Sequence, residues 1–282
     1  MAESFGVVSG AVGIATAFKA CIDCFEYIKL GRRFGRDFQT SQLALNCTRL
    51  RLSRWGEAVH IYDDPYLGRP NATLDELQNA KSTLFQILCL FEDSAAISRK
   101  YQLDPKHEGG DELAEFSAGE LEPVSASLNN KMRALAIRRQ KGASILKTTK
   151  WALFDGSEFK RLIENITLLT GNLETMFPAP QQQANLVSYE IQELEDEQQL
   201  KLLAGVAQGV DGCLQRAANE ALTGHRYQNI QIRGKALNGD AFDQNWRHGA
   251  IGAFHTYDGV VVEQGAKAIN GNQYGGTSFW DD

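Results

Sequence analysis

The sequence of 282 residues lacks the features that define several large classes of protein. It has no excess of basic residues: the formal net charge is −6, and sequence-independent nucleic-acid binding needs a basic surface that displaces counterions. It has only five cysteines, an odd number without regular spacing, which does not suit the disulfide framework of a secreted protein. We therefore expect no nucleic-acid partner and a reducing, cytoplasmic setting.

The motifs of common enzymes are also missing. There is no G-x-S-x-G, G-x-x-x-x-G-K-[ST], H-E-x-x-H or G-x-G-x-x-G. His60 beside Asp63 and Asp64 could form an acid/base cluster, but a lone histidine near a turn is more often structural. Cys21 and Cys24 have the spacing of half a zinc site, yet no second pair follows, so we interpret them as helix-packing residues. Acidic residues of the 190–197 stretch are interpreted as a solvated helix face: Glu190, Glu193, Glu195, Asp196 and Glu197. The sequence predicts a protein that is not an enzyme and has no cofactor or metal.

No apolar run is long enough to cross a membrane without help. The best candidate runs from Phe5 to Phe18, about fourteen residues, whereas a spanning helix needs about twenty. No basic residue precedes it, so a secretory signal is not expected. Small residues one turn apart would allow close helix packing in lipid. The sequence leaves two interpretations, a conditional membrane segment or a buried core helix, and the residues concerned are Phe5, Gly6, Gly10, Gly13 and Phe18.

Between about residues 36 and 220 the apolar residues recur at helical spacing. The predicted helices cover about 37–61, 74–91, 124–148, 159–176 and one or more segments within 186–222. Thr73-x-x-Glu76 and Asp155-x-x-Glu158 have the pattern of capping boxes at two helix starts. Residues 1–222 are therefore predicted to form an all-α helical bundle.

The run from Lys131 to Lys150 contains seven basic residues and no acidic residue. Near an anionic leaflet each such residue contributes about 1 kcal/mol of attraction. The alternative is a solvated helix face that is balanced by the acidic stretch from Asp111 to Glu122.

The composition changes after Thr223. Residues 223–282 contain one leucine, ten glycines and many Asn and Gln residues, which is too little apolar material for a core. Taken alone, this tail is predicted to be disordered.

The tail nevertheless repeats itself. "KALNGDAF" from Lys235 returns as "KAINGNQY" from Lys267, 32 positions later, and the segments upstream match at an offset of 30. The two units cover about 225–242 and 255–274, and the two extra residues are placed in a turn at about Gly265-Ala266. Each unit of a stacked β architecture buries its apolar side only against a neighbour, and identical chains can supply that neighbour. We predict that Lys235 lies over Lys267 and that Arg233 faces Glu263.

In this stacked form the predicted amyloid core consists of Ile230, Ile232, Ala236, Leu237, Asn238, Gly239, Val260, Val262, Ala268, Ile269, Asn270 and Gly271. Three aromatic residues are predicted to cover it: Tyr274, Phe279 and Trp280. The alternative is a disordered tail with a vestigial repeat, attached to a helical adaptor or scaffold.

Several stretches together resemble one family. They are "NGNQYGGTSFWDD" after the second repeat, "CIDCFEYIKLGRRFGRDF" from Cys21, "RLSRWGEAV" from Arg51, "RRQK" from Arg138 and "WALFDG" from Trp151. The chain resembles, along its whole length, the HET-s/HET-S family of filamentous fungi, in which a HeLo domain precedes a prion-forming tail.

The resemblance implies a HeLo-like domain at 1–222 and a prion-forming domain at 223–282, disordered when soluble and a two-rung β-solenoid as amyloid. It also implies heterokaryon incompatibility, with templating of the tail that activates a membrane-targeting, pore-forming cell-death domain. The implied partners are further copies of the chain, homologous prion domains, an NLR carrying a matching amyloid motif, and an anionic membrane. The implied location is the cytoplasm, followed by relocation to the plasma membrane.

Overall fold

The computed structural model describes residues 13–31, 37–102, 121–141, 151–153, 155–194, 196–223, 226–228, 230–237 and 256–269. Two compact units make up the chain, Met1–Gln215 and Arg216–Asp282.

Helices form the first unit. They are α1 (Ile14–Cys24), the short 3-10 helix η1 (Phe25–Tyr27), α2 (Phe38–Ala58), α3 (Leu74–Gln102), α4 (Pro123–Arg138), α5 (Gly156–Met176), α6 (Pro180–Glu193), α7 (Glu197–Ala207) and the beginning of α8 (Gly212–Thr223). The prediction of a helical bundle is confirmed for the described part of this unit.

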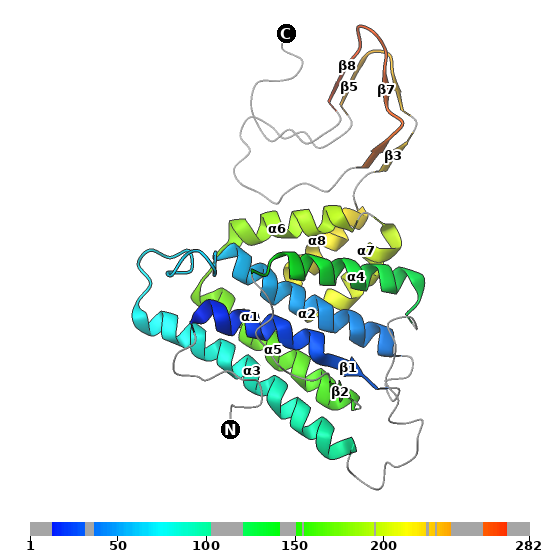
Figure 1. The fold of residues 1–282 in the computed structure, drawn as a ribbon. Coiled ribbons are helices and arrows are strands. Elements are labelled where there is room, and N and C mark those ends of the chain that lie inside the picture. The colour runs from blue at the N-terminus through cyan, green and yellow to red at the C-terminus, as the bar shows by residue number, and fades with distance from the viewer. Residues whose placement is uncertain are drawn as a thin grey trace. The chain divides into compact units, whose positions relative to one another are not determined.

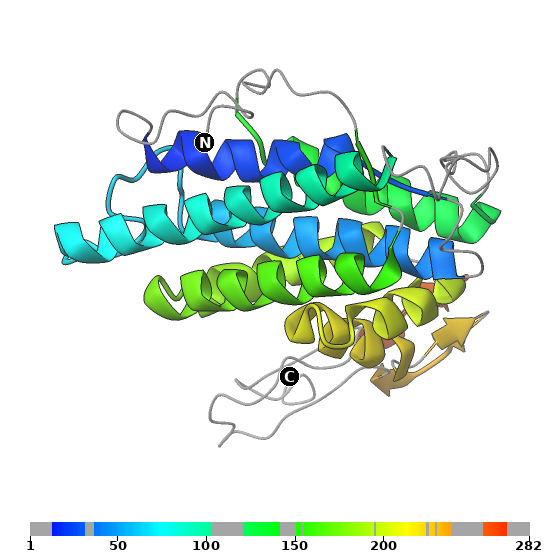
Figure 2. The ribbon, with the colours of Figure 1, turned by 90° about the horizontal axis from the view of Figure 1, so that it is seen from below.

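Helix α2 forms the centre of the bundle. It packs against α1, α4, α5, α6 and α7, while α3 packs between α1 and α5. The axes of α1, α2, α3 and α5 run nearly side by side (Figures 1 and 2). Because α2 is covered from several sides, it buries apolar residues around most of its surface, among them Leu43, Cys47, Leu50 and Trp55.

Two predicted capping sites are found at helix starts. Thr73 and Glu76 bond reciprocally before α3: the Thr73 N–H donates to the Glu76 carboxylate at 2.8 Å, and the Glu76 N–H donates to the Thr73 hydroxyl at 3.2 Å. Asp155 accepts from the Ser157 and Glu158 N–H groups and caps α5. At this second site the N-cap is confirmed, and the side chain of Glu158 pairs with Arg161.

Some helix boundaries differ from the prediction. The helix predicted over 124–148 ends at Arg138, and Arg139 leaves it to bind the buried Glu190. The stretch 186–222 contains parts of three helices, because Asp196 caps α7 and Asp211 accepts from the Leu214 N–H at the start of α8. Leu74 begins the predicted apolar stripe of α3 but is 83% exposed, since it lies in the first turn, before the helix reaches its neighbours.

The bundle also contains a parallel strand pair that the sequence pattern does not predict. Strand β1 (Ile28–Leu30) pairs with β2 (Trp151–Leu153), with Lys29 opposite Ala152. Each strand has only three residues, too few to show a period of two.

The described residues of the second unit contain six short strands, which pair two by two. Parallel pairs join β3 (Arg226–Gln228) to β6 (Thr256–Asp258), β4 (Gln231–Ile232) to β7 (Val261–Val262), and β5 (Lys235–Leu237) to β8 (Lys267–Ile269). The first two pairs have an offset of 30 residues and the third has an offset of 32, as the sequence repeat does.

A turn accommodates the two extra residues. The Ala266 N–H donates to the Glu263 carbonyl at 3.0 Å, and Gly265 has a φ of 86°, a value that favours glycine. Lys267 then pairs with Lys235, and Arg233 lies 2.9 Å from Glu263, in agreement with the predicted pairing.

Side-chain burial in the tail is uneven. Ile232 is buried, whereas its partner Val262 is 48% exposed. Ile230, Val260, Ala236 and Ala268 are partly exposed. The remaining predicted core and cover residues, apart from the backbones of Leu237 and Ile269, lie outside the described residues: Asn238, Gly239, Asn270, Gly271, Tyr274, Phe279 and Trp280.

Candidate functional site

The described part of the N-terminal apolar run is a core helix in this structure. Gly13 is exposed and precedes α1, whereas Phe18 is buried, with its ring centroid 6.2 Å from Trp55 and 5.9 Å from Tyr62. A Cβ at Gly56 would clash with the Phe18 ring, so the absence of a side chain at Gly56 makes room for α1. The other residues of the predicted membrane segment lie outside the described residues: Phe5, Gly6 and Gly10.

Two buried charges lie on the inner face of α1. Lys19 and Asp23 form an ion pair of 3.8 Å and are 6% and 5% exposed. The Gln140 side chain donates to the Asp23 carboxylate at 3.2 Å from the turn after α4. Buried charges are costly unless they are paired, so these contacts favour one docked position of α1.

A second charged contact fixes η1, directly after α1. Glu26 receives two hydrogen bonds from Arg133, at 2.7 and 2.6 Å, and a further bond from Arg49 of α2. Burial alone would raise the pKa of the Glu26 carboxyl, but the two arginines lower it to about 2. Glu26 therefore ties the N-terminal segment to α2 and α4 as a charged group.

A cluster of four charges occupies the interior of the bundle. Arg54 of α2 binds Glu190 of α6 at 2.8 Å and Asp211 at 2.7 Å, and Arg139 binds the other oxygen of Glu190 at 2.6 Å. Arg54, Glu190 and Asp211 have side chains that are 0–2% exposed. Although burial alone would raise the pKa of Asp211, the charge and hydrogen bonds of Arg54 lower it. The prediction that Glu190 lies on a solvated face is wrong.

The sequence does contain a signal for this cluster. Glu190 shares a helix face with Gln183, Val187 and Ile191, all of which are buried. Arg54 stands among Leu50, Leu52 and Trp55 of the central helix, which leaves its guanidinium no route to solvent.

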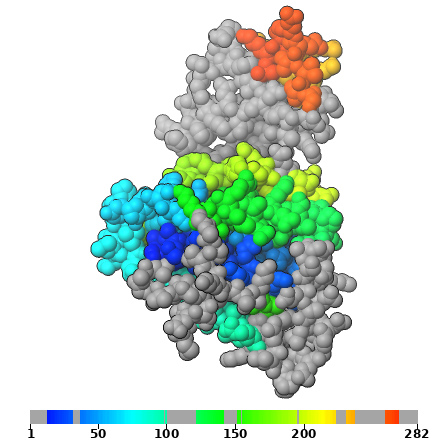
Figure 3. Space-filling model, in the orientation of Figure 1, coloured from blue at the N-terminus to red at the C-terminus, as the bar shows by residue number. Residues whose placement is uncertain are grey.

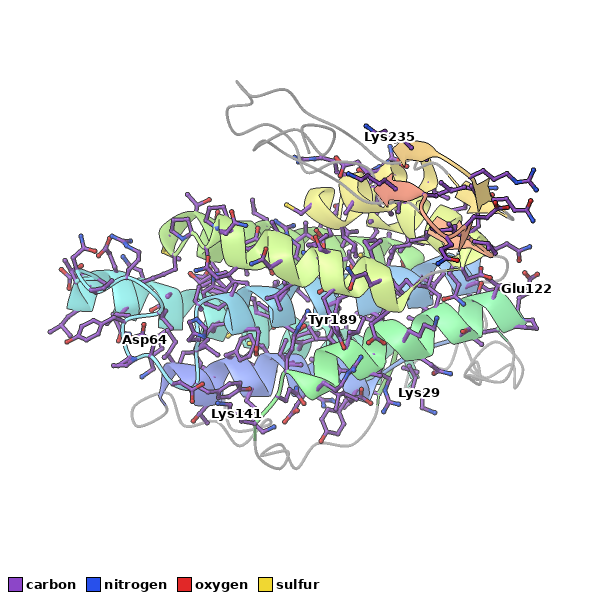
Figure 4. The ribbon with its side chains drawn as sticks, turned by 90° about the horizontal axis from the view of Figure 1, so that it is seen from above. Lys29, Asp64, Glu122, Lys141, Tyr189 and Lys235 are labelled. Atoms are coloured by element: carbon purple, nitrogen blue, oxygen red, sulfur yellow. The ribbon has the colours of Figure 1, made fainter. Side chains whose placement is uncertain are left out.

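In the described part of the basic run, acids from other elements pair with four of the basic residues. Within residues 131–141, Arg133 pairs with Glu26, Arg138 with Glu193, Arg139 with Glu190 and Lys141 with Asp63. On one face of the unit α4 and α6 lie beside each other (Figure 3). Tyr189 of α6 points toward α4, where it accepts a hydrogen bond from Arg138 at 3.3 Å (Figure 4). These four acids differ from the predicted balancing stretch, of which only Leu121 and Glu122 are described.

Three of the five cysteines and His60 have structural surroundings, whereas Cys89 and Cys213 are exposed. Cys21, Cys24 and Cys47 are buried free thiols, and burial raises their pKa, so these thiols stay protonated. His60 has a φ of 53° in the loop after α2, where Asp64 accepts hydrogen bonds from the Tyr66 and Gly68 N–H groups. These groups shape a turn.

A hollow of about 580 Å³ lies beside the first turns of α2 and α5. Its rim carries Asp37, Lys160 and Glu164, of which Lys160 and Glu164 form an exposed pair of 3.8 Å. In the described part of the chain no group of three or more His, Cys, Asp or Glu side chains could hold a metal ion. No helix among the described residues is long and apolar enough to cross a membrane.

Comparison with known proteins assigns this arrangement to a family. HeLo, described as "Prion-inhibition and propagation", matches residues 6–203. The chain belongs to the HeLo family. The HeLo match covers the described helices from α1 through α6 and most of α7.

Two curated relatives come from Podospora anserina. The chain is 35% identical over 292 residues to heterokaryon incompatibility protein s and 36% identical over 293 residues to heterokaryon incompatibility protein S, and the matches cover all of each chain. The solved HET-s N-terminal domain has a TM-score of 0.70 and 38% identity, covering 74% of this chain and 97% of that chain. A mutant of the same domain has a TM-score of 0.69. The predicted resemblance to the HET-s/HET-S family is confirmed.

Proposed function

We propose that this HeLo protein is a heterokaryon-incompatibility protein whose tail propagates an amyloid fold and thereby activates its helical domain at membranes. The names of both full-length relatives support the incompatibility role, and the description of the HeLo family refers to prion propagation. The pairing within the tail and the docking of α1 support the finer mechanism.

The parallel pairing of the two repeats is the observation that carries the proposal. A chain that stacks its own repeats in register leaves unpaired N–H and C=O groups at both outer strands, and these groups can pair with another copy. Val261 and Val262 are 54% and 48% exposed in the single chain. A second copy stacked on this rung would remove that apolar surface from water, which favours growth of a fibre.

One ion pair among the described residues of the repeats supports the same stacking. Arg233 and Glu263, which directly follow the paired strands β4 and β7, are in contact, whereas the register also brings Lys235 over Lys267. Like charges directly opposite are unfavourable, and the Arg233–Glu263 contact offsets part of this cost.

The helical domain is the part that we propose to act on a membrane. In the structure α1 is docked through Phe18 and Asp23, and the adjoining η1 is docked through Glu26. Release of these contacts would expose an apolar run whose small residues suit helix association in lipid. Basic residues of α4 such as Arg133 and Arg138 would then meet an anionic leaflet, provided that lipid phosphates replace Glu26 and Glu193 as their partners.

The proposed partners follow from this mechanism. They are further copies of the chain, homologous HET-s-type tails and an NLR with a matching amyloid motif, with the plasma membrane as the final location. Enzymatic activity is not part of the proposal.

Seeded leakage tests this function. The soluble full chain is mixed with preformed fibres of residues 218–282 and with vesicles that contain anionic lipid and a trapped dye. We expect fibre growth followed by dye release, with release reduced by Arg233→Glu and restored by the double variant Arg233→Glu/Glu263→Arg. If the tail stays soluble when it is seeded, the protein is a helical adaptor with an inert tail and the proposal is wrong.

A further inference from the structure

Polar contacts lead from the start of α8 to α1; they are buried around Arg54 and partly buried at Arg139 and Gln140, which are joined by the chain itself. At the α8 end, the Asp211 carboxylate accepts from the Leu214 N–H at 3.1 Å and so caps the helix. The second oxygen of Asp211 accepts from Arg54 at 2.7 Å. Arg51, one turn earlier on α2, donates to the Val210 carbonyl at 2.7 Å. Two arginines of the central helix therefore bind the turn that leads into α8.

The line continues through the charged cluster. Arg54 binds Glu190 through two nitrogens, at 2.8 to 3.1 Å, and Arg139 binds the same carboxylate at 2.6 Å. Two cations and two anions balance each other here, and water does not screen them. When one partner is removed, a buried charge is left without compensation, so the other groups must move or take up water.

The last step reaches α1. Gln140 follows Arg139 directly in the chain, and its side-chain N–H donates to the Asp23 carboxylate at 3.2 Å. Asp23 is 5% exposed. The position of Arg139 in the cluster therefore sets the position of the group that binds Asp23.

We infer that these residues form a relay, running from Asp211 through Arg54, Glu190, Arg139 and Gln140 to Asp23, that couples the start of α8 to the docking of α1. Helix α8 ends at Thr223, and the first tail strand begins at Arg226. Through this relay, tension at the C-terminal end of α8 weakens the contacts that dock α1. The purpose of the relay rests on the proposed function, but its existence is a property of the soluble chain alone.

Contact along a line does not by itself prove energetic coupling, so the test measures coupling. The soluble full chain is compared with Asp211→Asn by hydrogen exchange with mass spectrometry. Asparagine is also a good helix N-cap, so the substitution removes the charge that faces Arg54 while α8 keeps a capping side chain. We expect exchange in peptides over residues 17–27 to become at least about tenfold faster.

The matched control is Asp196→Asn. Asp196 caps α7 in the same way, through the Gln199 N–H at 2.9 Å, but it is an exposed residue rather than a member of the buried cluster. It is expected to leave exchange over residues 17–27 unchanged. Equal effects of the two variants on these peptides, or an Asp211→Asn effect confined to α8, would overturn the relay.

A second variant, Gln140→Ala, alters the α1 end of the relay, where the substituted side chain is only partly buried. Coupling is reciprocal, so Gln140→Ala should speed exchange of the Leu214 amide by at least about threefold. Gln181→Ala, which removes an exposed contact to Asn185 on α6, is the control and should have no such effect. An unchanged Leu214 amide in Gln140→Ala contradicts the relay, even if Asp211→Asn fails to fold.

The double variant Asp211→Asn/Gln140→Ala completes a cycle. If the relay couples the two ends, Asp211→Asn speeds hydrogen exchange over residues 17–27 less in the Gln140→Ala background than in the wild type. Additive effects of the two substitutions on this exchange rate contradict the relay. No fibre or vesicle enters these measurements. Failure of the relay is therefore distinguishable from failure of the seeded leakage that tests the proposed function.

Discussion

At the scale of single residues, α1 is docked by a few close fits. Gly56 leaves the space that the Phe18 ring fills, and Glu26 joins η1 to two arginines from other helices. Each contact can be altered without touching the tail, which separates the stability of the helical domain from fibre formation.

Gly56→Ala should loosen α1. The added methyl group meets the Phe18 ring, and overpacking of this kind costs about 1–3 kcal/mol of unfolding free energy. Gly205→Ala in α7 is the control, because nothing lies within 4 Å of its new Cβ, and helix propensity should give about 0.5–1 kcal/mol of stabilisation. Urea unfolding measures both. Equal stabilities of the two variants would contradict the docking of Phe18 on Gly56.

Glu26 should make stability depend on acid pH. Its folded pKa of about 2 lies below that of the unfolded chain, so its contribution is complete above about pH 5 and is lost as the pH falls toward 2. The wild type should exceed Glu26→Gln by at most about 3 kcal/mol near pH 6, with the difference vanishing near pH 2. Glu164→Gln, which breaks an exposed pair with Lys160, serves as control. A pH-independent difference for Glu26→Gln would be inconsistent with the two arginine contacts.

Sequence patterns predict apolar burial better than polar burial. Phe159, Leu162 and Ile166 are buried as their helical spacing predicts, and Thr73 and Asp155 stand at helix starts as their capping patterns predict. The spacing of Glu190 with Val187 and Ile191 places it on the buried face of α6, but the partner that neutralises it, Arg54, lies 136 positions earlier, where local spacing contains no information about it.

At the scale of elements, the tail repeats determine which strands can pair. The spacing of the repeats predicts the pairing of Lys235 with Lys267 and the turn at Gly265, because an offset between similar segments is itself a register. The pairing of β1 with β2 was not predicted, because strands of three residues in unrelated stretches have no such signal.

Val261→Pro should abolish growth of tail fibres. The Val261 N–H donates to the Ile230 carbonyl at 2.8 Å, and proline has no N–H to give. Gln264→Pro is the matched control, since Gln264 precedes the Gly265 turn residue, a position where proline is favoured. Thioflavin fluorescence of seeded tails should be lost in the first variant and kept in the second. Normal growth of Val261→Pro fibres would show that this strand pairing is absent from them.

Lys267→Gln should speed fibre elongation, because it removes one of two like charges that face each other in the register. Lys267→Arg keeps the charge and should elongate at the rate of the wild type. The elongation rates of seeded tails at low salt provide the comparison. If the Gln variant elongates no faster, the two lysines do not oppose each other in the fibre.

At the scale of the whole molecule, the helical unit is larger than the spacing between successive chains in the proposed fibre. In the proposed fibre, two rungs per chain would advance the axis by about 9.5 Å, whereas a folded unit of 215 residues has a radius of gyration of about 17 Å. Helical domains attached to such a fibre would therefore crowd one another. Crowding would raise their local concentration and pull on α8, the helix that precedes the tail strands.

The most direct test of the central claim is dye release from anionic vesicles by the full chain, seeded with its own tail fibres. The account predicts release that follows fibre growth and is absent with Val261→Pro in the full chain, although that variant keeps the circular dichroism of a folded helical domain. Release by unseeded Val261→Pro at the rate of the seeded wild type would contradict activation by the tail.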